Sequence, residues 1–99
     1  MVTVLVHHNI KDYNAFASRA AEFIMSLKPE KGWQYLKTYS AAPVKLEAWC
    51  VWRIANALTI VDFQKEFSQA IGNTGTVEPT WVTEFVPETF PPFQFVPKK

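Results

Sequence analysis

The sequence has few of the residues that cross-link or anchor small proteins. Cys50 is the single cysteine, so neither an intramolecular disulfide nor a cysteine-based zinc site can form. No apolar run approaches the ~20 residues that a membrane span requires, and the first residues lack the basic segment of a signal peptide. Ten basic and nine acidic side chains leave a net charge of +1, which favours neither a nucleic acid nor an anionic membrane as partner. These absences predict a cytoplasmic protein in a reducing compartment.

Motifs of cofactor-dependent chemistry are also missing. The three glycines form no phosphate-binding loop, and the sequence has neither a dinucleotide fingerprint nor a serine nucleophile motif. His7 and His8 are neighbours in a predicted strand, where successive side chains leave on opposite faces, so the two cannot chelate one metal ion. We therefore expect no metal and no cofactor.

Aromatic residues are what the sequence has in excess. Eight Phe, four Trp and three Tyr occur among 99 residues, and 48% of the chain is apolar. A chain of this length buries roughly two-thirds of its unfolded surface and forms a core without cross-links. We expect one domain over residues 1–88, followed by an extended tail over 89–99 that is rich in proline and phenylalanine.

The first half of the chain carries three clear secondary-structure patterns. β-branched residues predict a strand over 2–8. Asp12 can cap a helix of about four turns, because apolar residues follow it at spacings of three and four. Alternating side chains predict strands over 33–40 and 45–54, and the short turn between them makes this pair antiparallel.

The second half repeats the helix and the strand. Asn56 or Thr59 can cap a second amphipathic helix, which ends where Gly72 permits a left-handed C-cap. A last strand is expected over 77–86, and Pro79 near its start favours an edge position.

The order β-α-β-β-α-β defines an α+β, ferredoxin-like fold. Right-handed crossovers place both helices on one face of a four-stranded antiparallel sheet with spatial order 4-1-3-2. An uncovered apolar face is unfavourable for a soluble monomer, so we predict a homodimer, packed sheet against sheet as an α+β barrel. The residues expected on that face are Leu5, Tyr35, Tyr39, Trp49, Trp81 and Phe85.

Three segments resemble the small dimeric α+β barrel proteins: residues 4–13, residues 48–67 with the run Ala-Trp-Cys-Val-Trp-Arg, and residues 79–85. The similarity covers roughly residues 2–88. This superfamily includes antibiotic-biosynthesis-type and haem-degrading monooxygenases, polyketide cyclases, muconolactone-isomerase-like enzymes and stress-response proteins. His8 and Trp52 match positions that line a pocket in the haem-degrading branch. The iron-ligating histidine of that branch and the late histidine or tyrosine of the cyclases have no counterpart here.

A pocket between the helices and the sheet is the candidate site. His8 lies on the helix-facing side of its strand, where an imidazole could act as a general base or could simply bond a backbone carbonyl. Trp52 shares that face beside small residues such as Cys50, and could wall a pocket or fill the core. Tyr13 and Phe67 could close the pocket from the helices.

The opposite face offers a second, ionic group. Glu47 and Arg53 alternate along one predicted strand beside Tyr35, Lys37 and Tyr39 of its neighbour. Such a group could bind an anion, although cross-strand ion pairs and dimer contacts are the simpler interpretation.

Three hypotheses for function follow from these patterns. The first is a homodimer that binds a small apolar or phenolic molecule and acts as a cofactor-free monooxygenase, cyclase or isomerase, with His8 as the base. The second is the same dimer as a non-catalytic binding or stress-related protein. The third is a purely structural dimer whose cavities are filled by its own side chains.

Overall fold

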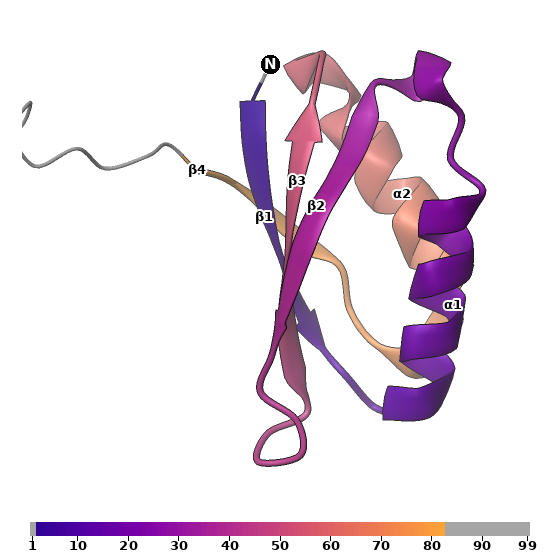
Figure 1. Ribbon diagram of the computed structural model, residues 1–99, viewed down its shortest axis with the longest axis vertical. Coiled ribbons are helices and arrows are strands. Elements are labelled where there is room, and N and C mark those ends of the chain that lie inside the picture. Colours follow the sequence, from indigo (N-terminus) through magenta and orange to yellow (C-terminus); the bar gives the residue numbers. More distant parts are fainter. Residues whose placement is uncertain (1, 83–99) are drawn as a thin grey trace, which may run out of the picture.

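The computed structural model describes residues 2–82. Its elements are β1 (Val2–Asn9), α1 (Tyr13–Met25), η1 (Pro29–Lys31), β2 (Trp33–Ser40), β3 (Glu47–Ile54), η2 (Ala57–Thr59), α2 (Ile60–Ile71), η3 (Gly72–Thr74) and β4 (Glu78–Val82). The strands form one antiparallel sheet in the order β2-β3-β1-β4, and both helices lie on one side of it (Figure 1). The α+β class, the ferredoxin-like element order and the strand order are thus confirmed. The end of the expected last strand, the boundary at residue 88 and the tail over 89–99 lie outside the described residues.

Local hydrogen bonds explain where the helices begin. The Asp12 side chain accepts a bond from the backbone N–H of Ala15 at 3.1 Å and so caps α1. Ahead of α2, the Asn56 side chain accepts from the N–H of Leu58 at 3.0 Å and caps the short turn η2. The Thr59 side chain makes no capping bond to α2; its hydroxyl donates to the carbonyl of Asn56 at 2.7 Å and accepts from the indole N–H of Trp33 at 3.0 Å.

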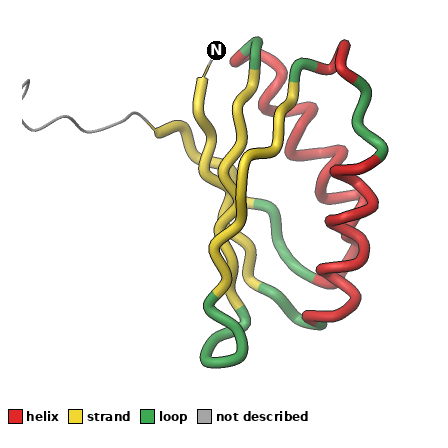
Figure 2. The backbone as a smooth tube through the Cα atoms, viewed as in Figure 1, coloured by secondary structure: helices red, strands yellow, loops and turns green. Residues whose placement is uncertain are grey.

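The core lies between the helix layer and the sheet layer, which Figure 2 shows side by side. Aromatic rings dominate it: Phe23 stacks on Phe67 at 4.6 Å between centroids, and Phe63 meets Trp52 edge-on at 4.9 Å. Trp52, Phe63 and Phe67 are fully buried. Full burial of one such side chain stabilises the fold by about 1.5–3 kcal/mol, so the aromatic excess is largely a requirement of the core.

Two residues expected on the uncovered face lie on the helix-covered face instead, so those predictions were wrong. Tyr35 pairs with Trp52 across the sheet, and an irregularity between Tyr35 and Lys37 then shifts the register, so only the later residues of β2 follow the expected alternation. Trp81 pairs with Val4, a buried residue of the helix side, and directly opposed side chains share a face. Trp81 nevertheless remains 59% exposed on the edge strand. Phe85 lies outside the described residues.

Candidate functional site

The structure places His8, Trp52 and Phe67 together beneath the helices. All three side chains are fully buried, and the Phe67 ring lies 5.2 Å from the His8 ring and 5.7 Å from the Trp52 ring. Phe23 and Phe63 pack around the same indole at 6.1 and 4.9 Å. The expected common face of His8 and Trp52 is therefore present, and aromatic side chains pack closely around the indole.

A cavity of about 190 Å³ opens beside this cluster, between α1 and strands β2 and β3. Small side chains create it, because alanines of α1 face Ala48 and Cys50 of β3 where larger residues would close the gap. We call it the α1 cavity. It is lined by Tyr13, Phe16, Ala17, Ala20, Ala21 and Ile24 of α1 and by Tyr35, Thr38, Ser40, Ala48 and Cys50 of the sheet.

Hydroxyl groups on the sheet side of the α1 cavity are bonded to one another. The Tyr13 hydroxyl lies 3.3 Å from Ser40 Oγ, and the Tyr35 hydroxyl lies 2.6 Å from Thr38 Oγ1. Thr38 Oγ1 is also 3.2 Å from Cys50 Sγ. Burial raises the pKa of the Cys50 thiol, and the bond from Thr38 opposes that change only in part, so the group is neutral at pH 7. The cavity thus combines apolar walls with uncharged, already bonded polar groups.

His8 adjoins the α1 cavity without lining it. Its Nδ1 lies 2.7 Å from the carbonyl oxygen of Thr76, which can only accept, so Nδ1 carries the proton. Nε2 is buried and has no hydrogen-bond partner in the described part of the chain. Burial lowers the pKa of His8 more strongly than the bond to Thr76 raises it, and the ring is therefore neutral at pH 7. The Phe16 ring, which lines the cavity, packs against His8 with 4.9 Å between the centroids.

Of the four predicted site residues, Tyr13 lines the α1 cavity, whereas Trp52 and Phe67 lie in the adjoining core and His8 lies behind Phe16. Sequence reasoning missed the alanines of α1 and the hydroxyl residues of β2. The alanines carried a readable signal, because three of them recur on one face of an otherwise bulky helix. The hydroxyls carried none, since the register shift in β2 decides which of its side chains turn toward α1.

On the uncovered face, His7 sits between two carboxylates. Its Nδ1 lies 2.7 Å from Glu78 Oε1 and its Nε2 lies 3.4 Å from Glu47 Oε1, while the ring packs on Trp49 at 5.3 Å. The bond to Glu78 is the main reason that the pKa of His7 is raised above its usual value; partial burial opposes it and Glu47 adds to it. The ion pairs therefore stabilise the fold fully below about pH 6.5, and that contribution is lost as the pH rises through the raised pKa. Glu47, which the sequence analysis placed in an ionic group on this face, therefore forms a cross-strand ion pair, and its partner is His7.

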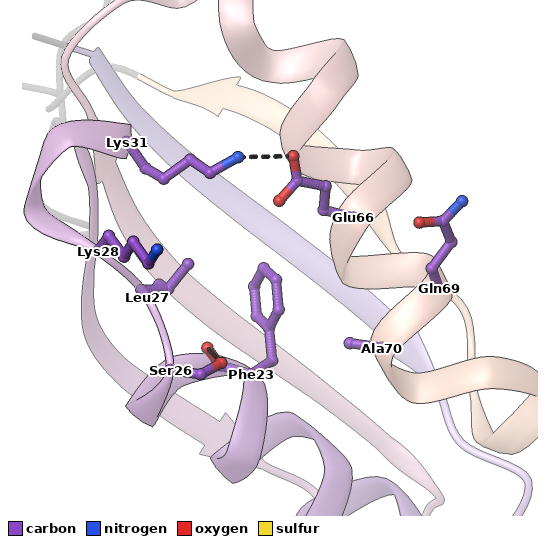
Figure 3. Close-up of a pocket in the computed structure, with 8 residues that line it drawn as sticks. All are labelled: Phe23, Ser26, Leu27, Lys28, Lys31, Glu66, Gln69 and Ala70. Carbon is purple, nitrogen blue, oxygen red and sulfur yellow. Dashed lines mark hydrogen bonds and ion pairs between the residues drawn. The ribbon is translucent and has the colours of Figure 1, made fainter.

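A wider, open groove of about 650 Å³ separates the end of α1 from α2 (Figure 3). Phe23, Leu27 and Ala70 form its apolar part, and Lys31 Nζ reaches Glu66 Oε2 at 2.8 Å across one end. The same ammonium lies 4.9 Å from the centre of the Trp33 ring. This groove is wide and open to solvent, whereas the α1 cavity is smaller and more enclosed.

Within residues 2–82, no group of three or more histidine, cysteine or acidic side chains could hold a metal ion. No helix in the same part of the chain is long and apolar enough to cross a membrane. No protein-family model, curated protein or solved structure matches this chain.

Proposed function

We propose that this protein binds a small aromatic molecule in the α1 cavity. The supporting observation is the cavity itself: about 190 Å³ with alanine and aromatic walls and with hydroxyls that are bonded to one another. An engineered apolar cavity of about 150 Å³ in another protein is large enough for benzene. A single aromatic ring with a small substituent is therefore the size class that fits.

Calorimetric titration with toluene, phenol and indole tests this proposal. For ligands with so few atoms we expect a Kd of about 0.1–1 mM. Ala21→Leu adds bulk to a cavity-lining position that is exposed enough to tolerate it, and it should abolish binding. Ser18→Leu adds the same side chain to an exposed position of α1 outside the cavity and should leave binding unchanged. Equal affinities of the two variants would contradict the proposal.

A second candidate function is proton abstraction from the bound molecule, as in a cofactor-free monooxygenase, cyclase or isomerase of the kind that the resemblance suggests. The observation that favours it is the neutral His8 ring with an unshared pair on Nε2. Oxygen uptake and product formation with a panel of phenols and quinols would test it. If a confirmed substrate were turned over equally fast by the His8→Ala variant, His8 would not be the base.

We further propose that two copies pack through their uncovered sheet faces. Leu5, Trp49 and Val51 lie there, each only partly buried in the single chain, and Tyr39 is 57% exposed. Three strands of eight residues and one of five, spaced about 4.8 Å apart and rising about 3.3 Å per residue, present roughly 460 Å². Two copies would bury roughly 900 Å², close to the about 1,000 Å² expected of a specific interface. A buried thiol at Cys50 fits the reducing, cytoplasmic setting in which we place this dimer.

Sedimentation equilibrium tests the dimer directly. We expect a species of twice the 11.4 kDa of the chain. Leu5→Lys places a charge in the centre of the uncovered face and should give the monomer. Val61→Lys, at a position of α2 that is 73% exposed, should not change the mass. A wild-type chain that stays monomeric at millimolar concentration would rule the dimer out.

A further inference from the structure

The buried atom Nε2 of His8 is the starting point. It is an acceptor, because Nδ1 carries the proton that is donated to Thr76, and among residues 2–82 it has no hydrogen-bond partner. A buried acceptor without a donor loses its hydrogen bonds to water and gains none in return, so such an atom is unusual unless a ligand or another group satisfies it. The hydroxyls of the α1 cavity are bonded to one another, whereas His8 Nε2 is a neighbouring acceptor that no group within residues 2–82 engages.

The sheet register brings this atom close to the α1 cavity. His8 pairs directly with Ala48, which lines the cavity, and the Cβ atoms of opposed residues lie about 5 Å apart. The two ring nitrogens point in roughly opposite directions. Nδ1 points toward Thr76, in the segment that leads to β4, and β3 lies on the other side of β1. The strand that carries Ala48 and lines the cavity is thus the neighbour of β1 on the side away from β4.

Phe16 lies between the two. Its ring lines the α1 cavity and also packs against the His8 ring at 4.9 Å. On another side the ring rests on the backbone of Gly75, where an added Cβ would come within 3.1 Å of Phe16 Cδ1. Phe16 is thus the side chain that contacts both the His8 ring and the cavity, and a ligand would reach His8 only if this ring moved.

From this arrangement we propose that His8 Nε2 accepts a hydrogen bond from the hydroxyl of a phenolic ligand in the α1 cavity, and that Phe16 moves aside to allow it. This inference rests on the proposed binding function and narrows it from aromatic molecules in general to phenols. His8 acts here as a specificity-determining residue, and the bond requires no proton transfer.

Phenol and toluene form the matched pair of ligands, because they share size and shape and differ in the hydroxyl. One charge-neutral hydrogen bond to a buried acceptor should favour phenol over toluene by about tenfold in Kd. The variant His8→Asn keeps a donor near the position of Nδ1 and removes the acceptor at Nε2, so phenol and toluene should then bind equally. Tyr13→Phe removes the most accessible cavity hydroxyl and should leave the preference intact.

A spectroscopic signal reports on His8 itself. With ¹⁵N-labelled histidine, phenol should move the Nε2 resonance upfield, as expected for a ring nitrogen that gains a hydrogen bond, whereas toluene should not. Phe16→Leu replaces the separating ring with a smaller side chain and should strengthen phenol binding, and adding His8→Asn should remove that gain.

The outcomes separate the two proposals. If neither toluene nor phenol binds, the proposed function fails. If both bind but the phenol preference survives His8→Asn or disappears in Tyr13→Phe, ligand binding stands and the role of His8 is refuted. An Nε2 resonance that phenol leaves unchanged would also refute it.

Discussion

Replacing Phe67 with alanine tests whether this residue is a member of the core or a wall of the ligand site. Phe67 is fully buried, stacks on Phe23 at 4.6 Å and meets Trp52 and Phe63 edge-on, each at 5.7 Å. Truncation of a phenylalanine in such surroundings removes its transfer free energy and leaves a cavity. We expect the free energy of unfolding to fall by about 3–5 kcal/mol.

Urea denaturation followed by tryptophan fluorescence measures this loss. With an m-value of about 1.5 kcal/mol/M, the midpoint should fall by about 2–3 M. Val61→Ala, at a 73% exposed position of the same helix, should change the stability by no more than about 0.5 kcal/mol. Since a domain of this size is stable by only about 5–15 kcal/mol, the alanine variant can unfold completely. Phe67→Leu, which keeps most of the volume, should then cost about 1–2 kcal/mol.

The refuting result is a Phe67→Ala variant as stable as Val61→Ala. That outcome would mean that the rings around Phe67 do not form a tightly packed cluster. It would also return Phe67 to the role that the sequence suggested, as the wall of a pocket that is open to a ligand.

Three further predictions concern local features of the fold. Gly32→Ala should lower the stability by about 1–2 kcal/mol in urea denaturation, because Gly32 has φ +72° and an added Cβ would lie 3.0 Å from Ala55 Cβ; Gly32→Asn should cost less, since asparagine tolerates this conformation. Asp12→Ala removes the cap of α1 and should cost about 1 kcal/mol by the same assay, and Asp12→Asn should restore most of it. The adjacent histidines should have opposite effects when stability is measured from pH 5 to pH 8. His7, whose pKa is raised in the folded chain, stabilises the fold below about pH 6.5 and loses that contribution as the pH rises, so His7→Gln should remove this pH dependence. His8, whose pKa is lowered, destabilises the fold as the pH falls below about 6.5, so His8→Asn should be less sensitive to acid; a pH dependence that neither substitution alters would contradict both assignments.

Most of the fold could be predicted from the periodic spacing of apolar residues in the sequence. The β-branched run of β1 and the apolar stripes of α1 and α2 are local patterns with a single stable geometry, so they predicted element type, order and the buried face of β1 and β3. The right-handed crossover rule then left the strand order that is observed. Tyr35 and Trp81 were assigned to the wrong face because alternation fails at a register irregularity and because the phase of a short edge strand depends on its partner.

Only part of the candidate site could be predicted from the sequence. The sequence predicted that His8 and Trp52 share one face of the sheet and that a cavity lies near the small residues of β3. Both predictions depend only on the alternation of side chains along a strand. It could not locate that room, because the position of a void depends on how the rings of two helices interdigitate. In the structure the rings close around Trp52 and leave the gap over Ala48 and Cys50, beside Tyr13.

The sequence by itself determined which residues are buried along β1, β3 and the two helices, because burial there follows a fixed period of two or 3.6 residues. Only the tertiary structure decided what those buried residues do. Packing set Phe16 between His8 and the α1 cavity, and a backbone carbonyl 68 positions further along fixed the His8 proton on Nδ1. Contacts between distant parts of the chain have no local pattern, so volume and hydrogen bonding had to be read from the folded molecule.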